Sequence, residues 1–219
     1  MTRINPRIGP RIDRVVTSGT FSLDGETFDV DNNVWVIGDD DSALVVDPAH
    51  DAEPIIAAIG SRELVAIVCT HGHDDHISGA GDLWDVTRAP VWLHPADRML
   101  WDVLYHDLGP DRDLVDGSVL AVAGVELTAL HTPGHSPGST CLYAPDLGTV
   151  FTGDTLFQGG PGATGRSFSD RPTIESSIRA RLLGLPADTT VRTGHGDSTT
   201  IAAEAERPPF AGQAERDSS

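Results

Sequence analysis

Short apolar runs, separated by clusters of glycine, aspartate and asparagine, dominate the first third of the chain, which predicts β-strands joined by tight turns. The predicted strands are Val15–Thr17, Val34–Ile37 and Ala43–Val46. Residues 39–41, between the last two strands, are all aspartate, which is typical of a solvated hairpin tip. We therefore expect this part of the chain to form an antiparallel meander.

The pattern then changes from strands alone to strands that alternate with helices. A helical period over Pro54–Ile59 precedes a continuous apolar strand, Leu64–Cys69. Two further helices are predicted over Ile77–Val86 and Pro95–Tyr105, the second with proline at its first position. We expect the aromatic Trp101 of the second helix to pack in the core or at its rim.

A second series of strands and one helix follows. The predicted helix covers Thr173–Leu183, and the predicted strands are Val119–Ala123, Val125–Leu130, Thr140–Ala144, Thr149–Thr152 and Thr189–Thr193. The chain thus divides into two halves in which strands precede helices. We expect one domain over residues 1–206 and a frayed tail over residues 207–219.

Composition and charge exclude several partners and chemistries. The 219 residues include 33 acidic and 15 basic side chains, for a net charge of −18, which repels nucleic acid and anionic membranes. No lysine is present, so a lysine base or Schiff base is excluded. Cys69 and Cys141 lie in apolar runs and are expected to be buried thiols. With no apolar run of signal-peptide or membrane-helix length, we expect a cytoplasmic protein.

The densest chemistry follows the strand Leu64–Cys69, where the chain reads Thr-His-Gly-His-Asp-Asp-His over residues 70–76. In this H-x-H-x-D-H motif, His71 and His73 can converge on one cation. Asp75 and His76, beyond the turn, face a neighbouring position, so one loop can serve two metal ions. Imidazole and carboxylate are ordinary ligands of zinc and also suit iron or manganese.

Three more candidate ligands end predicted strands, and each follows a glycine, which allows the backbone to bend and approach closely. They are His135, Asp154 and His195. We expect a surface or supporting role for the other four histidines, which are His50, His94, His106 and His131.

A rival motif is present at residues 134–138, which read G-x-S-x-G. Ser136, Asp154 and His195 also follow the chain order of an α/β-hydrolase triad. That site needs a backbone N–H directly after the serine, and Pro137 has none. We therefore do not expect a serine hydrolase.

Together, these residues resemble the metallo-β-lactamase superfamily, over roughly Val15–Gly196. The resemblance implies an α/β fold, a four-layer αβ/βα sandwich with two mixed sheets flanked by helices. It implies a first metal ion held by His71, His73 and His135, and a second held by Asp75, His76 and His195, with Asp154 bridging both. Asp47 is similar to a strand-end aspartate that supports the site in relatives.

Details of the motifs favour one subgroup. An aspartate at position 154 is similar to the glyoxalase II-like hydrolases and persulfide dioxygenases rather than to classical β-lactamases. His73 differs from the glutamate usual in flavodiiron relatives, and Phe157 lacks the hydroxyl of the tyrosine that lactone-hydrolysing relatives often carry. In the subgroup an arginine follows the metal aspartate, so the resemblance implies that Arg166 binds substrate.

The leading hypothesis is a binuclear metal-dependent hydrolase of thioesters, in which a hydroxide held between two divalent ions attacks the carbonyl. Asp75 and Asp154 are the carboxylates assigned to catalysis, and zinc is the expected metal, with iron or manganese as alternatives. Other hypotheses stay open. One is a persulfide dioxygenase with a single Fe(II) held by His71, His135 and Asp154 or a similar set. A lactonase or other ester hydrolase, and a non-catalytic metal scaffold, are the others.

The expected substrate is a small molecule. Full-length glyoxalase II proteins grip glutathione with an additional C-terminal helical domain, and this chain ends soon after His195. We therefore expect a low-molecular-weight thiol conjugate, of glutathione or of another thiol such as mycothiol, with a homodimer left open.

Overall fold

Two six-stranded sheets form the centre of the computed structural model, which describes residues 9–210. The strands of the first sheet follow in sequence order and are β1 (Arg11–Leu23), β2 (Glu26–Gly38), β3 (Ser42–Val46), β4 (Glu63–Val68), β5 (Val91–Leu93) and β6 (Arg112–Asp113). Strands β1 to β3 pair antiparallel, which confirms the expected meander, whereas β3 to β6 pair parallel.

The second sheet has the order β14-β13-β10-β9-β8-β7. Its strands are β7 (Val119–Val122), β8 (Val125–His131), β9 (Thr140–Ala144), β10 (Thr149–Gly153), β13 (Thr190–Thr193) and β14 (Thr199–Thr200). Only β10 and β13 pair parallel, so both sheets are mixed. A separate two-stranded sheet joins β11 (Leu156–Phe157) to β12 (Gly160–Pro161).

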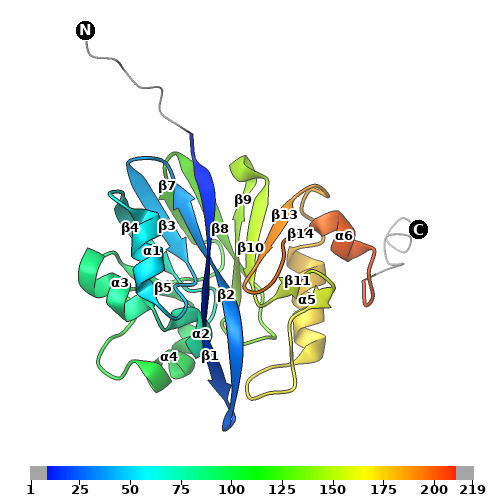
Figure 1. Cartoon of the computed structure of the whole chain (residues 1–219). Helices are drawn as coiled ribbons and strands as arrows, with labels where there is room; N and C mark the ends of the chain where they lie inside the picture. The colour runs from blue at the N-terminus through cyan, green and yellow to red at the C-terminus, as the bar shows by residue number, and fades with distance from the viewer. Residues whose placement is uncertain (1–8, 211–219) are drawn as a thin grey trace.

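Helices cover the outer faces of both sheets (Figure 1). The helices are α1 (Ala52–Ile59), α2 (Asp74–Ile77), α3 (Ala80–Thr87), α4 (Arg98–Leu104), α5 (Arg171–Arg181) and α6 (Ile201–Ala205), with 3₁₀ turns η1 (Pro95–Asp97) and η2 (Pro145–Leu147). In Figure 1, α1, α3 and α4 lie beside the first sheet and α5 and α6 beside the second. The expected four-layer αβ/βα sandwich is confirmed.

The alternation of side chains along β2 explains the layers. Val34 and Val36 point to the core beneath the first group of helices, and Trp35 and Ile37 point to the core between the sheets. Successive side chains of a strand face opposite sides, so a strand buried on both faces is apolar throughout. The continuous apolar runs of the sequence are therefore the central strands of the sandwich, which are covered on both faces.

The helix predicted over Ile77–Val86 is present as α3 from Ala80, but its predicted start is wrong, because Ile77 ends a separate helix, α2. The amide of Ser78 donates to Asp74 and ends α2, and the amide of Gly79 donates to the carbonyl of Pro48 at 2.8 Å. The break thus comes from a contact with a loop that is distant in sequence. The helix predicted over Pro95–Tyr105 begins with η1 and continues as α4, and Trp101 is fully buried.

The expected tail from residue 207 is wrong for its first residues. Phe210 is 2% exposed and packs with Ile178 and Ile201 on the outer face of the second sheet. Its ring packs in an apolar cluster, although the prolines and polar residues around it in the sequence form no apolar pattern. The rest of the predicted tail, residues 211–219, lies outside the described residues. Among the helices that the structure describes, none is long and apolar enough to cross a membrane.

Candidate metal centre

The ends of strands from both sheets meet at one edge of the sandwich. The candidate ligands follow β4, β8, β10 and β13, and are His71, His73, Asp75, His76, His135, Asp154 and His195. The amide of Thr140 donates to the carbonyl of Thr70 at 2.8 Å, and the amide of Asn33 donates to the carbonyl of Gly194 at 2.7 Å. These two bonds tie the sheets together directly beside the ligand loops. The structure thus brings all seven predicted side chains together.

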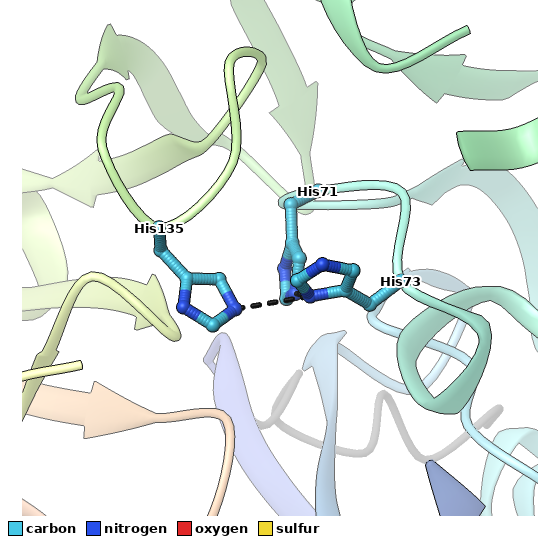
Figure 2. Close-up of side chains that lie close together, drawn as sticks. All are labelled: His71, His73 and His135. Atoms are coloured by element: carbon cyan, nitrogen blue, oxygen red, sulfur yellow. Dashed lines mark hydrogen bonds between the residues drawn. The ribbon is translucent and has the colours of Figure 1, made fainter. Parts of the chain in front are cut away.

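Three imidazoles form the first cluster (Figure 2). His73 Nδ1 lies 3.0 Å from His71 Nε2 and 3.0 Å from His135 Nε2. Two tetrahedral zinc ligands at about 2.0–2.1 Å from the ion are separated by roughly 3.3 Å. The spacing of the ring nitrogens therefore fits a single divalent ion.

Two imidazoles and a carboxylate form the second cluster. His195 Nε2 lies 3.2 Å from both His76 Nε2 and Asp75 Oδ2, and His76 Nε2 lies 3.6 Å from Asp75 Oδ2. Each residue offers one ligand atom, and these atoms lie within 4.8 Å of one another. This set also fits one divalent ion.

Asp154 lies between the clusters. Its Oδ1 is 3.3 Å from His76 Nε2, and its Oδ2 is 3.6 Å from His135 Nε2 and 3.5 Å from His195 Nε2. The close approach requires Gly194, because a Cβ atom there would lie 2.3 Å from Asp154 Oδ1. One carboxylate therefore faces both clusters, which is the arrangement a bridging ligand needs.

The unsatisfied groups of the site also favour a cation. Asp154 Oδ1 is buried and accepts no hydrogen bond from the described residues, although His76 is near. A buried carboxylate oxygen without a donor is costly unless a positive charge compensates it. Because the donors are imidazoles and carboxylates with no thiolate, the residues present fit zinc, iron or manganese.

Protonation differs between the two clusters. Burial lowers the pKa of His71 and brings the pKa of His73 to about 3, so these imidazoles are neutral and can bind a metal ion. Burial also opposes charge on His195, but the carboxylate of Asp154 outweighs it and raises the pKa of His195 to about 10. Without a metal ion, the second cluster thus retains protons that a cation would displace.

Hydrogen bonds on the outer side orient the rings. His135 Nδ1 donates to the carbonyl of Ala163 at 2.9 Å, and His195 Nδ1 donates to the carbonyl of Asp31 at 2.8 Å. A proton held on Nδ1 leaves Nε2 free as a metal ligand, which fixes the productive tautomer. The fold therefore holds a proton of each ring on Nδ1, so that Nε2 is the nitrogen available to a metal ion, in His195 once its second proton is displaced.

The predicted supporting residue Asp47 lies directly behind His76. Its Oδ2 is 3.1 Å from His76 Nδ1 and accepts from the hydroxyl of Thr70 at 2.8 Å, and its Oδ1 accepts from the amide of Thr70 at 2.7 Å. The carboxylate thus joins the strand end to the second cluster.

Asp97, a fully buried aspartate at the end of η1, has a role that the sequence motifs do not predict. Its carboxylate accepts from the amides of Gly72 and Gly138 at 2.9 and 2.6 Å, and from the hydroxyl of Ser136 at 2.6 Å. Asp97 therefore links the loop of His71 to the loop of His135. Burial raises the pKa of Asp97, which these three donors counteract. The bond from Ser136 also shows that this serine serves Asp97 rather than a triad.

Other predicted residues lie at varied distances from the centre. Arg166 lies with its guanidinium 4.5 Å from the ring centre of Phe28, and it lines a pocket with His73 and His135. His94 and His131 stack on each other at 4.1 Å in a separate place. His50 was expected to have a surface or supporting role, and it contacts the second cluster through Asn32, a residue that no sequence motif indicates.

The comparisons with known proteins agree with this geometry. The family model of the metallo-β-lactamase superfamily matches residues 27–195. The hydroxyacylglutathione hydrolase GloC of Haemophilus influenzae is 34% identical, over 81% of this chain and 92% of that protein. The crystal structure of the B3 metallo-β-lactamase BLEG-1 is 30% identical with a TM-score of 0.76, and covers 90% of this chain and 100% of that one. The crystal structure of TTHA1623 in a di-iron-bound form is 32% identical with a TM-score of 0.73, and covers 83% of this chain and 96% of that one.

The sandwich fold and the metal-binding cluster at the edge of its sheets define a metallo-β-lactamase-like protein. The chain belongs to the metallo-β-lactamase superfamily. The His/Asp cluster is of the kind that binds divalent metal ions.

Proposed function

We propose that the protein is a binuclear metal-dependent hydrolase of thioesters formed by a low-molecular-weight thiol. The observation that carries the proposal is the position of Asp154 between two clusters that each fit one ion. The similarity to a hydroxyacylglutathione hydrolase supports the substrate class.

Each ligand has an assigned place in this proposal. His71, His73 and His135 would hold the first ion, Asp75, His76 and His195 would hold the second, and Asp154 would serve both. Zinc is the proposed metal, and the di-iron form of TTHA1623 keeps iron as the alternative. Divalent ions in such a site lower the pKa of water and polarise a carbonyl group, so no side-chain base is needed.

The surrounding residues position the substrate. The pocket beside the first cluster contains Phe21, Leu23 and Arg166, which combine apolar walls with a guanidinium. Arg166 Nη2 lies 3.6 Å from Glu26 Oε2, whereas its Nη1 is buried and has no hydrogen-bond partner among the described residues. A planar guanidinium pairs well with a carboxylate or an amide carbonyl, groups that a thiol such as glutathione carries. We therefore assign Arg166 to substrate binding.

One competing function has support from the geometry. His71, His76 and Asp154 form a set of two imidazoles and one carboxylate within 4.8 Å, which is the ligand set of many mononuclear Fe(II) oxygenases. A persulfide dioxygenase would use such a set. The metal content and the substrate together distinguish this alternative from a hydrolase.

The test combines metal analysis with an activity screen of protein purified without chelators. We expect two ions per chain and hydrolysis of hydroxyacyl thioesters of glutathione or mycothiol, with no oxygen uptake from persulfides. Asp154→Ala should abolish turnover, and Asp146→Ala, at an exposed site, serves as the control. One iron per chain with persulfide-dependent oxygen uptake would contradict the proposal, as would hydrolysis of β-lactams or lactones in preference to thioesters.

A further inference from the structure

The second cluster contacts a buried amide that belongs to no ligand loop. Asn32 on β2 is fully buried, and its Nδ2 lies 3.1 Å from Asp75 Oδ2 and 3.4 Å from His195 Nε2. An ionised carboxylate can only accept hydrogen bonds, so the NH₂ group of Asn32 must face Asp75. The amide oxygen therefore points to the opposite side.

On that opposite side, the oxygen meets His50. The distance from His50 Nε2 to Asn32 Oδ1 is 2.8 Å, and because the amide oxygen is an acceptor, Nε2 must carry the proton. Burial lowers the pKa of His50, so its ring is neutral at pH 7 with Nδ1 unprotonated. His50 is thus a hydrogen-bond donor that fixes the orientation of the amide.

Contacts among three segments of the chain hold His50 in its position. Its backbone lies in the left-handed region at φ 58°, which is uncommon for residues other than glycine. Its amide donates to the hydroxyl of Ser78 at 2.8 Å. On β1, Gly19 leaves room for the ring, because a Cβ atom there would lie 2.2 Å from His50 Nδ1. A strained backbone held by distant segments indicates that the ring position is determined by the fold.

We propose that His50 and Asn32 form a positioning pair that sets the metal affinity of the second cluster. The inference rests on the proposed binuclear site. With His50 present, the amide donates to Asp75 and holds the carboxylate toward His195. Without it, the buried amide oxygen loses its donor, so the side chain of Asn32 is held on one side only and positions the Asp75 carboxylate less firmly. Partners of this kind typically change metal affinity by about 10- to 100-fold.

The experiment measures the affinity of each ion separately, by competition with a chromophoric zinc chelator. His50→Phe retains the ring volume and removes the donor, and we expect the second zinc to bind 10- to 100-fold more weakly while the first is unchanged. His50→Gln supplies an N–H in place of the imidazole donor and should restore most of the affinity. His106→Phe removes an exposed histidine and should match the wild type.

Gly19→Ala provides a second route to the same result, since it displaces the ring without removing a polar group. We expect it to weaken the second zinc as His50→Phe does, and thermal melting identifies any variant that fails to fold. Equal affinity for both ions in His50→Phe and wild type, or equal weakening of both ions, would overturn the inference while the binuclear proposal survives. A wild-type protein that binds a single ion would overturn both.

Discussion

Replacing Asp47 by asparagine tests how the second cluster keeps a ligand in its metal-binding form. In the structure, Asp47 Oδ1 accepts from the amide of Thr70, while Oδ2 faces the hydroxyl of Thr70 and His76 Nδ1. In Asp47→Asn, the retained oxygen accepts from the amide of Thr70 and the new NH₂ group faces His76 Nδ1. That ring nitrogen must then become an acceptor, which moves the proton to Nε2.

An Nε2–H group cannot bind a metal ion. Metal binding to the variant therefore costs the free energy needed to return the proton to Nδ1. The productive form places two N–H groups against each other, which leaves a buried donor unsatisfied and costs about 1–3 kcal/mol. This corresponds to a loss of roughly 5- to 150-fold in affinity for the second ion. Changes to residues behind metal ligands typically give about 10- to 100-fold, which agrees with this value.

The assay is zinc binding by competition with a chelator, with melting temperatures to verify folding. Asp188→Asn is the matched control, because it removes an equal charge at an exposed position. We expect the second ion to bind about 10- to 100-fold more weakly in Asp47→Asn and as in wild type in the control. An unchanged affinity in Asp47→Asn would refute the argument from the tautomer of His76.

Three further predictions concern substrate, protons and salt. Arg166→Ala should raise KM about tenfold with little change in kcat, as steady-state kinetics measures. The reason is that a guanidinium that pairs with the substrate stabilises the ground state and the transition state equally. Because the pKa of His195 is about 10 without metal, a metal ion must displace its proton, so affinity for the second ion should rise with pH below that value. Calorimetry in buffers of different ionisation enthalpy should show proton release. Added NaCl should raise the melting temperature, because the net charge of −18 repels itself and salt screens it.

Each of these three has a clear contrary result. An unchanged KM and an unchanged kcat in Arg166→Ala would remove Arg166 from substrate binding. Binding of the second ion without proton release would contradict the protonation of His195 in the metal-free protein. A melting temperature that falls or stays constant as NaCl increases would show that charge repulsion contributes little to stability.

The sequence predicts the buried strands well because their burial is local information, whereas it predicts only Val15–Thr17 and Val34–Ile37 of the longer, partly exposed β1 and β2. Strands such as β3 and β4 lie in the sandwich with both faces covered, and their continuous apolar runs express this directly. The candidate ligands could be predicted from the spacing of their motifs, and the structure places them after strands that end at the same edge. Shorter strands escaped prediction: β5 and β6 have three and two residues, too few for a periodic pattern.

The supporting residues could not be predicted, because their roles depend on contacts between distant segments. Asp97 accepts from Gly72 and Gly138, which are 25 and 41 residues away in the chain. Asn32 reaches Asp75 across 43 residues. A buried aspartate or asparagine has no local pattern that distinguishes it from one in a turn. Tertiary contact also explains the break between α2 and α3, where Gly79 binds the carbonyl of Pro48.

The central claim is that seven side chains share two metal ions at the edge of the sandwich. Anomalous X-ray diffraction at the zinc absorption edge, on crystals of zinc-loaded protein, tests it most directly. We expect two peaks about 3.5–4 Å apart, one among His71, His73 and His135 and the other among Asp75, His76 and His195, with Asp154 between them. A single peak, or peaks outside these side chains, would contradict the account.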